Sequence, residues 1–378
     1  MKNRILLILV LLAGITATEF FGGFKNDDVN SQSKIAELHR TIFEVVKNDV
    51  PFNTEKFTRI GYTLKMWEYE KDGMTLEKVV VFDNNTKAEL FTIQKSELPP
   101  IYKDPLSAPK EIKVDKIDAY YMSIQLPIPL GQVLPSVVSH RLFLKDTVNN
   151  LEVIREGGVF SPRKNEKPLV INSPVKGENW IFFNQSTLLY HFYTLFFVDG
   201  KIGCGERYAS DLLKLNDQDE LYKGDPKVNE SYFCYRDTLY AVADAIVHHT
   251  VDGLPENKGD ARDVKFNTVE EYAGNYIILD IGNGNYAVYV HCVTGSIIVK
   301  KGDKIKEGSP IALLGNSGNS TSAHLHFSIN DGPDFFMSNG LPFMLKQYEK
   351  TREVDAPEFK GPLKVSNSMM EEKSVVKF

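Results

Sequence analysis

The sequence predicts a mostly β protein, with an N-terminal β-sandwich-like domain followed by a second domain built on an antiparallel β-sheet. Short runs in which apolar residues alternate with other residues recur from Arg59 to about residue 330. Turn-forming Gly, Asn and Asp residues separate these runs. The length of 378 residues is too great for one small domain, since a domain averages roughly 150 residues.

Composition narrows the class of protein. Hydrophobic residues make up 42% and charged residues 25%, as in folded soluble proteins. The formal net charge of −6 gives no basic field, so we expect no nucleic-acid partner. Three cysteines cannot form a disulfide framework, although Cys204 and Cys234 could pair in an oxidising compartment or remain small buried hydrophobes.

The first 22 residues have the layout of a signal peptide or N-terminal anchor. Lys2 and Arg4 precede an apolar run over 5–15, and small residues follow at 16–18. The run is too short for a typical membrane-spanning helix, which needs about 20 residues. We therefore expect an extracytoplasmic protein, periplasmic, in the cell envelope or secreted. It is either soluble, which we favour, or tethered to a membrane by an uncleaved N-terminal anchor.

A helical segment is expected over residues 23–50. Asn30 and Ser33 offer capping side chains, and Pro51 forbids continuation of a helix. Apolar residues recur between them at helical spacing, at Ile35, Leu38, Ile42 and Val45.

The sandwich-like accessory domain is expected over residues 51–160. It shows no clustered nucleophile, acid pair or phosphate-binding loop, and His39 and His140 are single histidines typical of surface or packing positions. The domain is therefore interpreted as a scaffold or binding module. Its strands are expected at 60–66, 79–82, 89–93, 120–126, 141–144 and 151–154.

A linker is expected over 161–178, the second domain over 179–345, and an exposed charged tail over 346–378. Within the second domain, strands at 276–281 and 286–291 flank a Gly-Asn-Gly-Asn turn, which predicts a hairpin. A second hairpin is expected from 310–315 and 323–329, joined through residues 316–319.

Histidines gather in the second domain. In a strand, alternate side chains point to opposite faces, so His324 and His326 share one face. His291 ends the preceding strand and supplies a third imidazole if the two strands pair. Asp211 precedes an apolar pair and adds a carboxylate. Three histidines and a carboxylate are the side chains that bind zinc.

The chain resembles the lysostaphin-like (LytM-type) zinc metalloendopeptidases over roughly 179–342. The resemblance rests on motifs in one order: 207–211, 240–244, 274–276, 289–291, 299–308 and Gly315-Asn316-Ser317-Gly318-Asn319-Ser320 leading into His324-Leu325-His326-Phe327. It implies that Asp211 and His326 bind Zn²⁺, while His291 and His324 handle the proton and the developing oxyanion. It further implies an exported hydrolase that cuts peptide bonds in peptidoglycan cross-links.

One position departs from that family. The family usually has a histidine four residues before the aspartate, and here that residue is Arg207, which stays protonated and cannot bind zinc. His191 is our candidate replacement, carried on an expected strand that a turn at 199–200 would set beside Asp211. Alternatively, Arg207 pairs with Asp211 and fills the metal position.

That departure leaves two functions open. The first is the zinc metalloendopeptidase; the second is a catalytically inactive relative that binds cell-wall peptide or regulates a partner hydrolase. Residues 299–315 also have the pattern of a lipoyl- or biotinyl-like hairpin, but they lack an exposed lysine at its tip.

Overall fold

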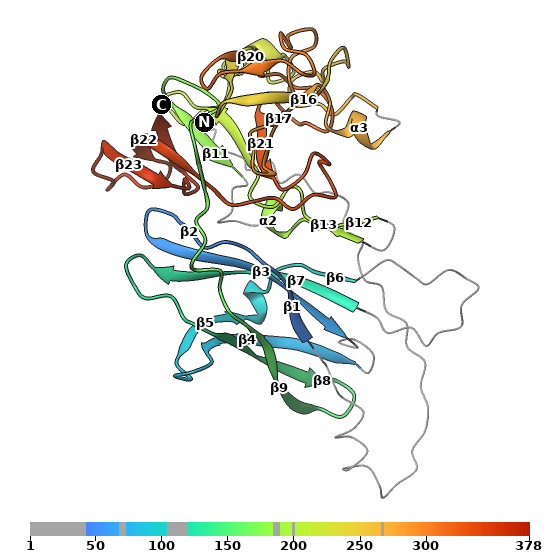
Figure 1. Cartoon of the computed structure of the whole chain (residues 1–378), viewed down its shortest axis with the longest axis vertical. Helices are drawn as coiled ribbons and strands as arrows, with labels where there is room; N and C mark the ends of the chain where they lie inside the picture. Colours follow the sequence, from blue (N-terminus) through green and yellow to red (C-terminus); the bar gives the residue numbers. More distant parts are fainter. Residues whose placement is uncertain (1–42, 68–72, 104–118, 184–189, 199–200, 266–267) are drawn as a thin grey trace, which may run out of the picture.

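The computed structural model describes residues 43–67, 73–103, 119–183, 190–198, 201–265 and 268–378. Two β-rich bodies lie one above the other, joined near α2 (Tyr190–Tyr193) and the hairpin of β12 (Phe196–Val198) and β13 (Lys201–Gly203) (Figure 1). The predicted mostly β class is confirmed. No helix in the described ranges is long and apolar enough to cross a membrane.

The N-terminal body is a sandwich of two antiparallel sheets. The alternating residues of the longest strands point inward, so that Ile60, Tyr62 and Leu64 are fully buried against the facing sheet. One sheet contains β1 (Phe43–Asn48), β3 (Phe57–Trp67), β7 (Ala119–Pro129) and β6 (Ile101–Lys103), with β2 (Phe52–Asn53) paired to β3. The other contains β5 (Glu89–Gln94), β4 (Met74–Asp83), β8 (Val138–Asp146) and β9 (Leu151–Phe160).

The expected helix over 23–50 is wrong where it can be compared. Residues 43–48 form the edge strand β1, in which Val45 pairs with Leu64 of β3. Phe43 points into the sandwich core, so pairing with β3 overrides a helical spacing that rested on few residues. The remainder of that segment, and the leader before it, lie outside the described residues.

The second body is built on one long sheet. Its core lies on one face and includes alternate residues of β18 and β21, such as Tyr289 and Phe327. The strand order is β10 (Leu169–Ile171), β22 (Phe343–Glu353), β24 (Ser374–Lys377), β11 (Trp180–Phe183), β14 (Ser210–Lys214), β21 (Leu325–Asn330), β18 (Tyr286–Val290), β17 (Tyr276–Asp280), β16 (Ala245–Val251) and β19 (Lys304–Ile305). β23 (Leu363–Ser368) pairs with β22.

Two expected boundaries are corrected. The expected linker contains β10, which pairs in parallel with β22. The expected exposed tail forms most of β22 and all of β23 and β24, and β24 lies between β22 and β11. Met369, Met370, Val375 and Val376 are fully buried, so a few apolar residues within a charged stretch are enough to place it in the sheet.

The first predicted hairpin forms from β17 and β18, but the second does not. β20 (Pro310–Leu313) pairs with β15 (Thr238–Tyr240), and β21 instead lies between β14 and β18. The residues between β20 and β21 form a loop held by distant side chains, described below, and so do not make a local turn. Cys204, Cys234 and Cys292 are free and buried.

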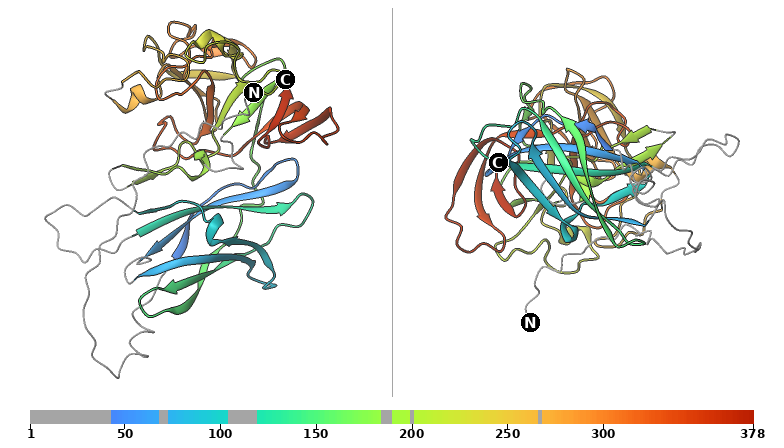
Figure 2. Two further views of the ribbon diagram at one scale, coloured as in Figure 1. Left: turned by 180° about the vertical axis from the view of Figure 1, so that it is seen from behind. Right: turned by 90° about the horizontal axis from the view of Figure 1, so that it is seen from below.

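The two bodies contact each other through polar and apolar side chains. Figure 2 shows from behind how the two bodies are stacked. Lys350 of β22 reaches the sandwich, where its Nζ lies 2.9 Å from Glu55 Oε2. Asp49 contacts Arg207 and Tyr208 of the second body. Gly61 of β3 is needed here because a Cβ at this position would lie 1.9 Å from the Tyr208 hydroxyl oxygen.

We predict that the sandwich loses stability between pH 6.5 and 4 because of His140. This fully buried ring bonds to Gly158 O at 3.0 Å and Tyr62 Oη at 2.9 Å, and burial lowers its pKa to about 4. The folded state favours the neutral ring, so its contribution is complete above the unfolded pKa and falls as pH drops towards the folded pKa. The loss is roughly 3 kcal/mol at about 1.4 kcal/mol per pKa unit.

Denaturant unfolding monitored between pH 7 and 4 checks this prediction. His140→Asn, which keeps a donor near Gly158 but cannot titrate, should unfold with a flatter pH dependence than the unmodified protein. Equal pH slopes for both proteins would contradict the assignment.

Candidate functional site

Asp211 and His326 form the centre of the candidate site. They are directly opposite each other on the adjacent antiparallel strands β14 and β21, so their side chains share one face of the sheet. His326 Nδ1 lies 3.1 Å from Asp211 Oδ1. Their neighbours Leu212 and Leu325, which are also paired, point into the core on the opposite face.

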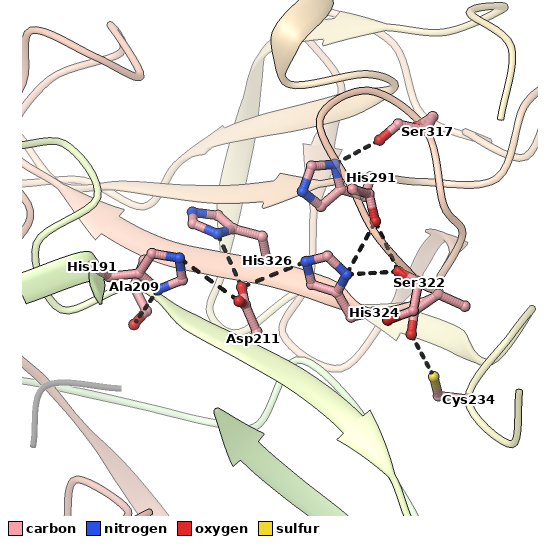
Figure 3. Close-up of polar contacts among 11 residues, drawn as sticks. His191, Ala209, Asp211, Cys234, His291, Ser317, Ser322, His324 and His326 are labelled. Carbon is pink, nitrogen blue, oxygen red and sulfur yellow. Dashed lines mark hydrogen bonds and ion pairs between the residues drawn. The ribbon is translucent and has the colours of Figure 1, made fainter. Parts of the chain in front are cut away.

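His191 approaches the same carboxylate from α2 (Figure 3). Its Nε2 lies 3.7 Å from Asp211 Oδ2, and its ring centroid lies 4.6 Å from that of His326. Its Nδ1 lies 3.3 Å from the Ala209 carbonyl oxygen, which accepts a hydrogen bond from Nδ1–H. The Nε2 lone pair is then directed at the site. The expected strand around His191 is wrong, because residues 190–193 form one helical turn. The expected hairpin forms just afterwards, from β12 and β13, while residues 199–200 lie outside the described residues.

Arg207 does not pair with Asp211. Its guanidinium turns away into the sandwich, where Nη1 lies 3.0 Å from Asp49 Oδ2. The alternative in which Arg207 fills the metal position is therefore wrong, and the place beside Asp211 belongs to His191 instead.

His324 and His291 complete the cluster on the side away from His191. His324 Nε2 lies 3.6 Å from Asp211 Oδ1, while its Nδ1 lies 2.8 Å from the Ser322 carbonyl oxygen. His291 Nδ1 lies 2.7 Å from the Ser317 carbonyl oxygen, and its ring centroid lies 4.7 Å from that of His324 (Figure 3). The structure thus brings together all five residues that the sequence analysis selected.

The alternation of side chains along β18 does not explain why His291 points into the cluster. Val290 is the residue opposite His326, whereas Tyr289 is opposite Phe327 in the core, so regular alternation would turn His291 towards the core. The strand ends at Val290, and His291 has φ +70° in the left-handed region. This uncommon conformation swings its ring to the site and is a form of backbone strain seen at functional positions.

The site is strongly coupled electrostatically. Burial alone would raise the pKa of the Asp211 carboxyl, but His191, His324 and His326 outweigh it and hold that pKa well below its usual range. Burial lowers the pKa of His324, and burial together with the neighbouring rings lowers the pKa of His291. Burial alone would lower the pKa of His326, but its hydrogen bond to Asp211 outweighs burial and raises that pKa.

The residues that hold the loop after β20 could not be recognised in the sequence. Asn257 Nδ2 lies 3.0, 2.8 and 3.2 Å from the carbonyl oxygens of Asn316, Gly318 and Ser320. Ser317 Oγ accepts from the Asn275 N–H at 2.9 Å. Asn257 stands between charged residues and has the composition of an ordinary turn, so only its burial shows its role. Asn275 lies in the 274–276 motif, but the sequence does not show that its backbone N–H holds Ser317.

A group of aromatic residues lies beside His326. The ring of Phe335 lies 5.6 Å from that of His326, and Phe336 packs on Phe335 at 4.8 Å. Tyr272 contacts Phe336 at 5.7 Å, and burial raises the pKa of its hydroxyl to about 12. Phe335 therefore packs against the imidazole of His326, and Phe336 and Tyr272 pack behind it.

The arrangement fits a zinc ion. One donor atom each from His191, Asp211 and His326 lie within 4.8 Å of one another. Two imidazoles and a carboxylate are a usual zinc donor set, and His326 Nε2 is buried without a hydrogen-bond partner among the described residues. The backbone bond at His191 Nδ1 is the kind of support that orients metal-binding histidines.

Part of the chain matches a known protein family. Residues 239–337 match the model of peptidase family M23. His291, His324 and His326 lie within that stretch, and His191 and Asp211 lie before it.

The chain is 43% identical over 58 residues to the peptidoglycan DD-endopeptidase ShyA of Vibrio cholerae, and 41% identical over 58 residues to ShyB of the same organism. Each match covers 15% of this chain and 13% of the relative, so the chain matches only a small part of these proteins.

Among solved structures, the chain is similar to the catalytic domain of lysostaphin from Staphylococcus simulans, with 21% identity, 32% of this chain and 88% of that chain covered, and a TM-score of 0.21. It is also similar to a zinc-containing peptidase from Vibrio cholerae, with 14% identity, 75% and 82% covered, and a TM-score of 0.23.

We predict that Asn257→Ala loosens the loop that orients His291 and His324. The Ser320 carbonyl oxygen would lose the Asn257 Nδ2 donor, and the carbonyl oxygens of Asn316 and Gly318 would keep only the backbone N–H groups of residues 257 and 320. We expect this to cost about 2 kcal/mol of unfolding free energy. Amide hydrogen exchange should accelerate at residues 316–320, and denaturant unfolding should report the loss. Asn285→Ala, which removes an exposed bond of 3.2 Å to Gly282 O, is the control and should change little. Unchanged exchange in Asn257→Ala would contradict the role of that side chain.

Proposed function

We propose, from the peptidase family M23 domain that residues 239–337 form, that this chain is an exported zinc-dependent metalloendopeptidase that hydrolyses peptide bonds in peptidoglycan cross-links. The match confirms the family resemblance expected from the sequence motifs. The observation that carries the proposal is the cluster of His191, Asp211 and His326, in which a histidine from outside the usual motif stands beside the aspartate.

These three residues would hold the metal. His191 would contribute Nε2, Asp211 a carboxylate oxygen and His326 a ring nitrogen, and three protein ligands are the number usual in catalytic zinc sites. When bound, zinc supplies Lewis acidity towards water and a peptide carbonyl. Asp211 is suited to this role because its low pKa keeps it ionised, and its charge compensates the cation.

His291 and His324 supply proton transfer. In each ring Nδ1 donates to a backbone carbonyl, so the neutral ring presents an Nε2 lone pair. Because burial lowers both pKa values, both rings are neutral at neutral pH. Such a ring accepts a proton from the attacking water at Nε2. As an imidazolium it then donates that proton to the amine leaving group or stabilises negative charge on the carbonyl oxygen.

The substrate class follows from the relatives. ShyA and ShyB are named as peptidoglycan DD-endopeptidases, each is similar to this chain over 58 residues, and residues 239–337 match the peptidase family M23 model. The signal-peptide layout of the first 22 residues supports export to the compartment where peptidoglycan lies.

The alternative function is a catalytically inactive relative that binds cell-wall peptide. Arg207 at the usual ligand position is the observation that favours it. The orientation of Arg207 away from Asp211, with His191 in the adjacent place, weighs against it. The two functions differ in their response to metal removal.

We predict that the purified protein binds about one zinc ion and that His326→Ala and His191→Ala each weaken zinc binding. Either change removes one of three protein ligands, so the loss should exceed the ~10- to 100-fold that follows loss of an outer-shell partner. Metal analysis and chelator competition measure the binding. His249→Ala removes an exposed imidazole from β16 and serves as the control. Full zinc affinity in His191→Ala would overturn its assignment as a ligand.

We predict that His324→Ala retains zinc but loses peptidase activity. The lost Nε2 no longer accepts a proton, and general-base catalysis typically contributes 10²- to 10⁴-fold. Release of fragments from purified peptidoglycan measures turnover. A chelator should abolish fragment release by the unmodified protein, and added zinc should restore it. Peptidoglycan binding that survives chelation, with no turnover in any zinc-loaded sample, would instead support the inactive relative.

A further inference from the structure

We propose that the ion pair between Asp49 and Arg207 positions His191. The N-terminal sandwich would then help to orient a ligand of the metal centre. This inference rests on the proposed function, because it takes His191 to be a metal ligand. Arg207 thus occupies the sequence position of the family's usual ligand and supports the histidine that replaces it. Asp49 and Arg207 are positioning residues and touch neither metal nor substrate.

The guanidinium of Arg207 is fully buried at the junction of the two bodies. Its Nη1 lies 3.0 Å from Asp49 Oδ2, and its Nη2 lies 2.5 Å from Thr63 Oγ1 and 2.8 Å from Ser123 Oγ. All three partners belong to the sandwich. A buried arginine needs such partners, since removing one leaves an uncompensated charge. The sandwich therefore fixes where Arg207 lies.

Arg207 in turn contacts the element that carries His191. Its Cζ lies 5.0 Å from the ring centroid of Phe192, the residue next to His191 in α2. Tyr208 contacts the same ring edge-on, with the two ring centroids 5.5 Å apart. A helix of four residues has too few hydrogen bonds to hold itself, so its orientation depends on these contacts.

The segment that follows Arg207 holds the His191 ring itself. The Ala209 carbonyl oxygen accepts from His191 Nδ1, and Asp211 lies two residues further along the chain. A shift of residues 207–209 would therefore move both the ring and its backbone partner. Such outer-shell partners orient metal-binding histidines.

The lack of a side chain at Gly61 is independent evidence that the sandwich surface fits Tyr208. The Tyr208 hydroxyl occupies the space that a Cβ at residue 61 would need, and it donates to Asp49 Oδ2 at 2.7 Å. Asp49 therefore accepts hydrogen bonds from both Arg207 and Tyr208, the two residues that contact the Phe192 ring. A sandwich that served only as a tether would need no such fit.

The test compares two ion pairs between the bodies, of which only the Asp49–Arg207 pair leads to the helix that carries His191. Asp49→Asn weakens the pair that leads to α2, whereas Glu55→Gln weakens the buried pair with Lys350, a strand residue of β22. Zinc affinity and zinc release rate are measured on the full chain by competition with a chromogenic chelator. Asp49→Asn should weaken zinc binding about 10-fold, and Glu55→Gln should leave it unchanged.

A second variant covers the case in which Asp49→Asn fails to fold. Phe192→Leu keeps an apolar side chain in α2 but removes the ring that Arg207 and Tyr208 contact. This variant should also weaken zinc binding about 10-fold. In a His191→Ala background, neither change should weaken zinc binding further, because both act through His191.

The outcomes separate this inference from the proposed function. If His191→Ala weakens zinc binding while folded Asp49→Asn and Phe192→Leu bind zinc like the unmodified protein, the positioning role is overturned and the ligand assignment stands. Equal losses in Asp49→Asn and Glu55→Gln would also overturn it, because they would indicate general loosening of the interface. If His191→Ala itself keeps full zinc affinity, the ligand assignment fails, and the inference fails with it.

Discussion

The pairing of β14 with β21 is the constraint on which the site depends. It sets Asp211 opposite His326, and the same register sends Leu212 and Leu325 to the core on the other face. A shift of one residue would exchange the two sets, burying a carboxylate and an imidazole among apolar side chains. The packing of the core therefore enforces the geometry of the polar cluster. The other three histidines are then placed around a carboxylate whose position is already fixed.

Much of this could be predicted from the sequence. The His-x-His pattern within an apolar run identified a strand face, and the strands of the sandwich followed from alternation in β3, β4 and β7. His191 was selected because Arg207 cannot bind a metal and because an expected hairpin would set it beside Asp211. The chemical argument needs no fold, whereas the expected strand is a helical turn in the structure. The direction in which Arg207 points could not be predicted, since its partners Asp49, Thr63 and Ser123 are distant in the sequence.

The failures share a physical origin. The helix expected before Pro51 and the tail expected after residue 345 were judged on local pattern, whereas β1 and β24 are stabilised by strands far away in the chain. The side chain of His291 was assigned by alternation, which the left-handed backbone at that residue breaks. Asn257 acts through burial and long-range bonds. Each case needs tertiary contacts that single-sequence patterns do not contain.

The place of β24 in the sheet has a consequence for how the molecule is assembled. This strand inserts between β22 and β11, so the sheet that carries β14 and β21 is interrupted until residues 374–377 are in place. During synthesis, about 190 residues separate β11 from the strand that must pair beside it, a long-range closure of the kind that slows folding. A nascent chain would therefore complete this sheet only after translation had passed β24, so the edge of β11 that faces away from β14 stays unpaired until the last strand is made.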